Sequence, residues 1–468
     1  MSESYTCSAR AKEAASQWLD NCVSNHEECS QTMLSDFLPT RLIDIGTEGS
    51  IVPRLVNSTS FKSPQRYITL SHCWGGQVPM TLRQDNLARM AQGIDYQCLP
   101  KTFRHALVVT RQLKCRYIWI DSLCIIQDSH EDWEKEASQM NQVYANAYCN
   151  LSASAAKNSS EGMFFHRHVL AIFPLRITLN KIQYYFQPSH ANIYSIVNDS
   201  TLNSRAWVYQ ERFLSPRILH FTPSQLFWEC KTQMACESYP MSCSQGDFML
   251  PPLKRVNPAL DGLLIRQRDG GSIFNQSPSP FVDAFAVWKE VIYNYSRRQL
   301  TRNSDKLVAI SGVAHEMNKI LDDDYLAGIW RRHLRYGLIW QILDEKSTRS
   351  SAYIAPSWSW ASTNGVVARK PLAEVEYEHA VEILRAEVVL AGPNRFGQVT
   401  SGYIELKGSL MTISLHSCRT DGLASHIILG CLADSRKCRL RFSLDTLRLN
   451  VNRDQEYSQR LHLPALSH

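Results

Sequence analysis

The stretch from residue 67 to residue 154 alternates apolar runs with amphipathic helical stretches, and this alternation limits the chain to a few folds. The runs "YITLSH", "YIWID" and "YCNLSAS" are apolar on successive residues, as strands with helices on both faces must be. Between them, residues 101–114 and 130–147 carry apolar side chains at helical spacing. The pattern predicts an α/β fold with a β-α-β-α-β unit, a parallel sheet and right-handed crossovers.

Each of the three runs ends in polar or reactive side chains. They are Ser71, His72, Cys73, Trp74 and Gly75 after the first run, Asp121, Ser122, Cys124, Gln127 and Asp128 after the second, and Ser152 and Ser154 after the third. Because parallel strands end at one edge of a sheet, and ligands bind in the crevice beyond it, we expect these residues to line a pocket. The alternative is that they are ordinary turn and capping residues.

The composition excludes several classes of protein. The 468 residues predict two or three domains. The net charge of +6 is dispersed rather than gathered in a basic run, so we expect no nucleic-acid partner. We find no secretory signal and no apolar run of about 18 residues, so we expect no membrane span and a cytoplasmic protein. The 14 scattered cysteines should then be mostly free thiols.

The remaining patterns divide the chain into five parts. We predict an N-terminal helical extension at 1–50, the α/β domain at 51–230, a linker or loop at 231–280, a helical region at 281–370 and a β-rich region at 371–468. In "APSWSWAS", Trp358 and Trp360 should lie on one side of an extended segment that packs the helical region on the α/β domain. Trp74, Trp119 and Trp207 either pack in the core or stack on a base.

Several motifs resemble the heterokaryon incompatibility (HET) domain of filamentous fungi. They are "LSHCWGG", the stretch from "LPKTFRHAL" through "YIWIDSLCIIQDS" to "AYCNLSAS", and "SRAWVYQERFLSPRILHF", with flanking likeness over residues 18–362. The resemblance implies a TIR-like α/β domain in self/non-self recognition that triggers programmed cell death, with other incompatibility proteins or its own copies as partners. Two alternatives stay open. One is an enzyme, either a nucleotide hydrolase or a small-molecule biosynthetic catalyst; the other is a scaffold without chemistry.

TIR-like enzymes that cleave NAD rely on a carboxylate beside the ribose, and this resemblance makes an NAD-like nucleotide the candidate ligand. Glu211 in "WVYQER" is the first candidate carboxylate, followed by Asp121 and Glu134. Arg205, Trp207 and Arg212 are expected around it. The competing interpretation of Glu211 is a structural ion pair with a flanking arginine. No G-x-G-x-x-G or P-loop pattern is found.

Two further clusters could carry chemistry. A thiol nucleophile with its base could be formed by Cys73 with His72, or by Cys124 with Asp121 and His72. The alternative is that these cysteines are buried and reduced. Cys22, His26 and Cys29 form C-x3-H-x2-C, three potential zinc ligands. A tetrahedral site needs a fourth, for which Cys7 is the nearby upstream thiol; the alternative is packing on a helix face.

Overall fold

The structure of the chain is a computed structural model. It describes residues 4–30, 36–46, 52–76, 80–186, 195–241, 280–340, 342–343, 347, 350, 352–368, 381–408, 410–420, 425–431 and 461–464. Met1–Gly271 and Ser272–His468 form two compact units, which are described separately. Most of the expected linker, from residue 242 to 279, lies outside the described residues.

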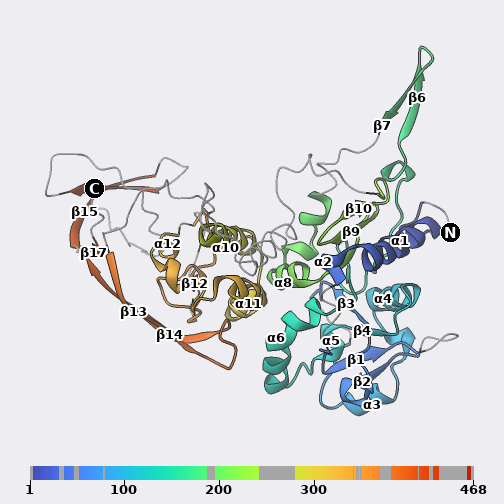
Figure 1. Cartoon of the computed structure of the whole chain (residues 1–468), viewed down its shortest axis with the longest axis horizontal. Helices are drawn as coiled ribbons and strands as arrows, with labels where there is room; N and C mark the ends of the chain where they lie inside the picture. The colour runs from blue at the N-terminus through green and yellow to red at the C-terminus, as the bar shows by residue number, and fades with distance from the viewer. Residues whose placement is uncertain are drawn as a thin grey trace. The chain divides into compact units, whose positions relative to one another are not determined.

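The first unit is built on an eight-stranded sheet with the order β10-β9-β8-β5-β3-β4-β1-β2 (Figure 1). Its strands are β1 (Arg41–Asp44), β2 (Arg54–Asn57), β3 (Tyr67–Ser71), β4 (Tyr117–Trp119), β5 (Cys149–Ser152), β8 (Arg217–Phe221), β9 (Leu226–Cys230) and β10 (Met234–Cys236). The four central strands, β8, β5, β3 and β4, run parallel, and antiparallel strands flank them on both sides. The predicted parallel core is confirmed.

Helices connect the central strands and cover the sheet. They are α3 (Leu87–Gln92), α4 (Lys101–Gln112), α5 (Asp121–Cys124), α6 (His130–Ala145) and α8 (Ala206–Leu214). α4 connects β3 to β4, and α6 carries the chain back past β3 to β5, so right-handed crossovers place the two helices on opposite faces (Figure 1). The order in which strands are added to the sheet therefore reverses between β3 and β5. Open α/β folds bind ligands at the edge of the sheet beyond such a switch point.

The N-terminal segment does more than extend the domain. It forms α1 (Ala9–Asn25) and α2 (Glu27–Ser30), as the helical prediction required, but residues 41–44 form β1, which pairs with β2 and β4. The N-terminal segment therefore contributes a strand to the sheet in addition to its helices. Its strand is buried on both faces because Leu42 and Ile43 are apolar, and Arg41 bonds the Asp132 carboxylate at the start of α6.

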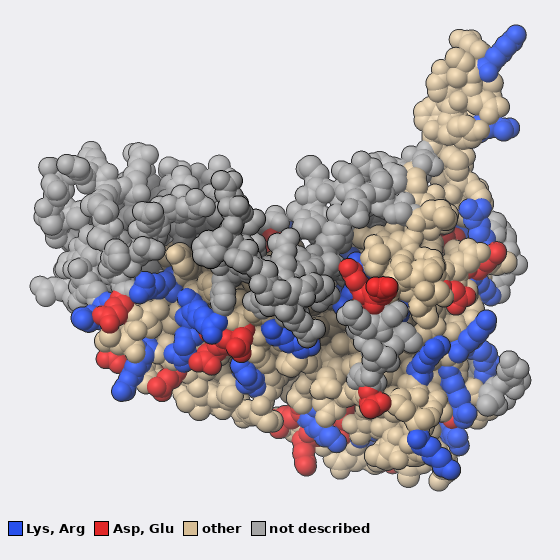
Figure 2. Space-filling view, in the orientation of Figure 1, with Lys and Arg blue, Asp and Glu red and all other residues tan. Residues whose placement is uncertain are grey.

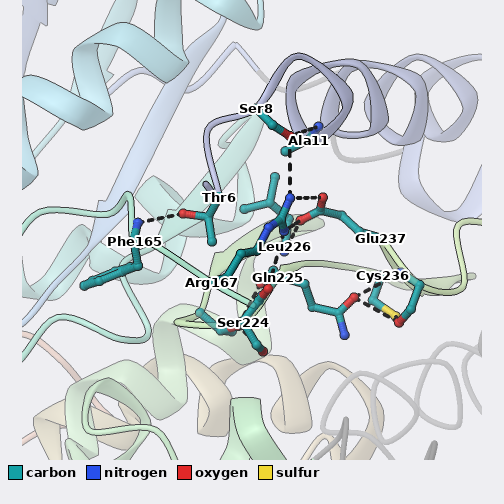
Figure 3. Close-up of polar contacts among 12 residues, drawn as sticks. Thr6, Ser8, Ala11, Phe165, Arg167, Ser224, Gln225, Leu226, Cys236 and Glu237 are labelled. Carbon is teal, nitrogen blue, oxygen red and sulfur yellow. Dashed lines mark hydrogen bonds and ion pairs between the residues drawn. The ribbon is translucent and has the colours of Figure 1, made fainter. Parts of the chain in front are cut away.

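An ion pair with both side chains fully buried joins the N-terminal residues to the far edge of the sheet. Arg167 and Glu237 form two parallel bonds of 2.5 and 2.8 Å (Figure 3). Arg167 also reaches the hydroxyl of Ser8, which caps α1, while Glu237 accepts the backbone N–H of Leu226 on β9. One pair of charges therefore connects α1, the segment before β6 and the β9–β10 hairpin.

A two-stranded hairpin, β6 (Leu175–Leu179) and β7 (Ile182–Phe186), projects from the first unit. Its side chains are largely exposed, and Figure 2 shows a neutral surface with basic side chains on it. Elsewhere in Figure 2 charges of both signs are mixed. None of the helices in the described part of the chain has the length and apolar character needed to cross a bilayer.

The second unit contains helices followed by strands, as predicted. The elements are α10 (Pro280–Ser296), α11 (Val308–Leu321), β11 (Tyr325–Leu326), β12 (Ile329–Trp330), α12 (Leu334–Gly337), β13 (Val381–Leu390), β14 (Val399–Gly408), β15 (Leu410–Thr420), β16 (Ser425–Cys431) and β17 (Leu461–Pro464). Trp360 is buried in this unit and donates to the Gly328 carbonyl at 2.9 Å. The expectation of an extended segment is wrong here, because Ser359 caps a 3-10 turn at Trp360–Ser362.

Candidate functional site

The carboxyl group of Glu211 lies at the switch-point edge of the sheet, where β3 and β5 end. Glu211 projects from α8 and is 7% exposed. The Ser71 hydroxyl, at the end of β3, donates a short hydrogen bond to Oε2 of Glu211, and the Tyr144 hydroxyl on α6 also contacts this carboxyl. Burial raises the pKa of Glu211 to about 7, although the Ser71 bond opposes the shift. A carboxyl with this pKa changes charge near neutral pH.

A chain of hydrogen bonds through Thr69 and Asn150 orients the Ser71 hydroxyl, which donates to Glu211. The Thr69 hydroxyl donates to the Asn150 carbonyl at 3.1 Å, and the Asn150 amide donates to the Ser71 oxygen at 3.0 Å. Because the amide of Asn150 donates to Ser71, the single hydroxyl proton of Ser71 is available to Glu211. Thr69 and Ser71 share one face of β3, since side chains two apart on a strand point the same way.

Asp121 is the more exposed carboxylate of the same site, and the buried His72 lies beside it. Asp121 follows β4, its side chain is 25% exposed, and its Oδ1 lies 3.7 Å from Nδ1 of the buried His72. The indole of Trp74 donates to Oδ2 of Asp121 at 2.8 Å. Burial lowers the pKa of His72, and Asp121 partly offsets this. Asp121 in turn raises the pKa of Glu211, so the two carboxylates belong to one electrostatic site.

The two arginines that flank Glu211 in sequence have different surroundings. Arg205, at the N-terminus of α8, donates to the His72 carbonyl at 2.5 Å, and its charge lowers the pKa of Glu211. Arg212 is buried and donates to Glu229 at 2.8 Å. Arg212, which is adjacent to Glu211 in sequence, therefore pairs with another carboxylate. The hydrogen bonds to the Glu211 carboxyl come mainly from the hydroxyl groups of Ser71 and Tyr144.

The candidate thiols are poorly suited to nucleophilic chemistry at neutral pH. Cys73 packs in an apolar cluster with Leu202 and Val208, and burial raises its pKa. Cys124 is fully buried, and burial raises its pKa to about 12. Since the thiolate is the nucleophile, both groups favour the packed, protonated state.

The other predicted lining residues are distributed around this edge of the sheet. Ser122, Gln127 and Asp128 bond residues of the 82–84 loop: the Ser122 carbonyl accepts from Leu82, the Gln127 N–H donates to Leu82, and Asp128 accepts from Gln84. Ser152 and Ser154 bond each other, and Ser154 lies 3.4 Å from His220. Trp207 is partly buried and Trp119 is fully buried against Tyr144, while Glu134 is exposed on α6.

A separate cluster of Cys and His side chains lies at the N-terminal helices. Ligand atoms of Cys22, His26, Cys29 and Cys230 all lie within 4.8 Å of one another, so the four could hold a metal ion. The sequence pointed to three of them. The fourth is Cys230 of β9 and not Cys7, whose thiol lies beside Lys12.

Gly75 shapes the loop that follows β3. Its φ is +76°, and a Cβ atom there would lie 2.5 Å from Cβ of Asn158. Gly75→Ala should therefore destabilise the protein by about 1–3 kcal/mol in urea unfolding, through left-handed strain and this clash. Gly76→Ala is the matched control, because a Cβ atom at Gly76 would have no neighbour within 4 Å, and it should have a much smaller effect. Equal losses in both variants would contradict this role for Gly75.

One comparison with known proteins finds a match, and it covers the stretch that holds this site. Residues 67–211 match the family model described as heterokaryon incompatibility protein (HET), a stretch that runs from β3 to Glu211 itself. The chain therefore carries a HET domain, and this suggests a role in heterokaryon incompatibility. The search of curated proteins found no match. The search of solved structures found none either.

Proposed function

We propose that this chain acts in fungal self/non-self recognition and promotes programmed cell death through its HET domain, in the cytoplasm, with other incompatibility proteins or further copies of itself as partners. The observation that supports the proposal is the buried carboxyl of Glu211, which accepts from Ser71 at the switch-point edge of the parallel sheet, within the stretch that matches the HET model. Buried titratable groups of this kind concentrate at functional sites.

The chemistry that this site supports is hydrolysis of an NAD-like nucleotide. The bond between ribose C1′ and the nicotinamide nitrogen breaks, and its electron pair leaves with nicotinamide. Positive charge then builds on the ribose, where the Glu211 carboxylate stabilises it, as carboxylates do in glycoside hydrolysis. Water adds to C1′, and its proton passes to the carboxylate and then to solvent. Asp121 adds negative charge to the site, and Ser71 and Tyr144 hold the Glu211 carboxylate in place.

Substrate would enter from the more exposed end of the site. Glu211 is buried, whereas Asp121 is a quarter exposed, Trp74 is partly exposed and Gly75 is exposed. We propose that a nucleotide displaces the Trp74 indole from Asp121 on binding. The aromatic ring is then free to stack on a base or on the nicotinamide ring.

The test of catalysis is nicotinamide release from NAD by the purified full-length chain. We expect wild-type protein to release nicotinamide in proportion to its concentration, and to arrest growth when expressed in a fungal host. Unchanged NAD together with growth arrest would refute the hydrolase chemistry and favour a scaffold that signals by association. Unchanged NAD with normal growth, and loss of a metabolite after gene deletion, would instead favour a biosynthetic catalyst.

A further inference from the structure

The side chains of Cys22, His26, Cys29 and Cys230 converge from two parts of the first unit that are far apart in sequence. We propose that these four residues form a structural Cys3His zinc site that fastens the N-terminal helices to the sheet. The proposal is independent of the chemistry at Glu211, because none of the four residues belongs to that site.

The spacing of the ligand atoms suits a tetrahedral zinc ion. Zn–S bonds of about 2.3 Å and Zn–N bonds of about 2.0–2.1 Å give tetrahedron edges of roughly 3.5–3.8 Å. In the structure, Nδ1 of His26 lies 3.4 Å from Sγ of Cys230, and all four ligand atoms lie within 4.8 Å of one another. A small contraction of the cluster therefore completes the coordination sphere.

The local backbone presents three ligands from one short segment. Cys22 lies in the last turn of α1, and His26 ends this helix by donating its N–H to the Cys22 carbonyl at 3.2 Å. Cys29 lies in α2, and its N–H donates to the His26 carbonyl at 3.1 Å. The bend between α1 and α2 thus turns all three side chains toward Cys230, the last residue of β9.

Polar groups lie beside two of the three sulfur atoms. The N–H of Gln233 donates to Sγ of Cys230 at 3.2 Å, within a turn that the Cys230 N–H closes on the Gln233 carbonyl at 2.9 Å. The Thr232 hydroxyl lies 3.8 Å from Sγ of Cys29. Donors to sulfur favour the thiolate form that binds metal, and such outer contacts are typical of built metal sites.

The donor set identifies the ion and the kind of site. Three sulfurs and one imidazole in tetrahedral arrangement suit zinc rather than magnesium or calcium, which require oxygen. Three thiolates and Zn²⁺ together carry one negative charge, and the buried Arg217 guanidinium donates to the Cys29 carbonyl at 2.8 Å, close to this charge. Four protein ligands leave no open position, so the site is structural. Cys22, Cys29 and Cys230 are not joined by disulfides in the structure, as zinc ligation requires.

Zinc at this position would stabilise the fold. Most of the sequence of the first unit lies between the ligands Cys29 and Cys230. The free energy of metal binding adds directly to the free energy of folding. The site would hold α1 against β9, the strand on which this helix packs. Removing the metal should therefore loosen the last turn of α1 from the end of β9, while the Arg167–Glu237 ion pair holds the start of α1 near the beginning of β9.

The experiment measures zinc in the full-length chain, purified without a metal-affinity step. We expect about one zinc per chain by elemental analysis, and a melting temperature that falls by several degrees when a strong chelator removes it. Cys230→Ser should reduce zinc occupancy at least about tenfold. Cys236→Ser is the matched control, because this cysteine is equally buried on the neighbouring strand and lies outside the cluster. It should retain full zinc.

Partly exposed His26 gives a second variant that does not depend on a buried thiol. His26→Ala should fold, bind zinc more weakly, and, after cobalt substitution, lose the tetrahedral visible spectrum that wild type shows. Three results would overturn the proposal: wild-type protein that is free of zinc and not stabilised by added zinc, zinc content unaffected by Cys230→Ser, or a disulfide among Cys22, Cys29 and Cys230.

Discussion

Glu211→Gln should lower NAD hydrolysis by about 100-fold or more, and abolish growth arrest in a fungal host if hydrolysis is the death signal. The substitution keeps an oxygen that can accept from Ser71 but removes the negative charge that would stabilise the developing ribosyl cation. Since the pKa of Glu211 is about 7, wild-type activity should rise as the pH increases through this value. Nicotinamide release across a pH series measures both effects.

A measurement of folding stability distinguishes loss of the Glu211 charge from loss of the folded structure in Glu211→Gln. The pKa of Glu211 is raised from its usual 4.5, so its contribution to stability is full below pH 4.5 and is lost as the pH rises through about 7. The shift corresponds to about 3 kcal/mol. Glu211→Gln removes this dependence, so the variant should be at least as stable as wild type at pH 8. A variant that is inactive because it is unfolded would contradict the catalytic role.

Glu134→Gln is the matched control for activity. Its side chain is 53% exposed on α6, where it lies near His130, and it shares no contact with Ser71 or Asp121. The sequence offered it as the third candidate carboxylate, and in the structure its carboxylate lies 3.7 Å from Nδ1 of His130 on the same helix. Its replacement should leave NAD hydrolysis unchanged. An equal loss in both variants would show that neither carboxylate is specifically required.

Much of the central fold could be predicted from local patterns. Strands that are apolar on both faces require helices on both sides, so residues 67–154 could hardly form anything but a parallel core. The start of α6 also follows from local chemistry, because Ser129 directly precedes the helix and its hydroxyl accepts the Asp132 N–H. β1 was harder to recognise. Arg41 and Asp44 are charged, and they are tolerated in a buried strand because of partners distant in sequence, Asp132 and Arg116.

The candidate site could be predicted only in part, for a related reason. Ser71, His72 and Asp121 could be predicted as site residues because they follow the ends of strands, and parallel strands end at one edge of the sheet. Tyr144 and Asn150 were missed. Tyr144 looked like one more apolar position on a helix face, and Asn150 lies inside a buried strand where a polar residue gives no local sign of its partners. Such residues become recognisable only when the tertiary structure brings their hydrogen-bond partners to them.

The N-terminal cluster shows the same limit. C-x3-H-x2-C is visible in the sequence, but it provides three ligands, and a search nearby for the fourth leads to Cys7. Cys230 is about two hundred residues away in the chain and follows no recognisable spacing. Only the packing of α1 on β9 brings its thiol to the cluster. Ligand sets that are completed from another element therefore need the fold before they can be identified.

Arg167→Met should cost about 3–5 kcal/mol of folding stability, because it leaves a buried charge without its partner. The arginine and Glu237 have no exposed side-chain surface, so removing one charge leaves the other buried and uncompensated (Figure 3). The measurement is urea unfolding at pH 7, compared with Glu134→Gln, which should change stability by less than about 0.5 kcal/mol.

The double variant Arg167→Met with Glu237→Leu decides how the pair acts. Because desolvation of two charges offsets much of their attraction, replacing both with apolar side chains should recover most of the loss. The recovery cannot be complete, since Glu237 also accepts the Leu226 N–H and Arg167 also donates to the Ser224 carbonyl at 3.4 Å. A double variant as unstable as Arg167→Met alone would show that these backbone bonds, rather than charge compensation, hold α1 and the β9–β10 hairpin together.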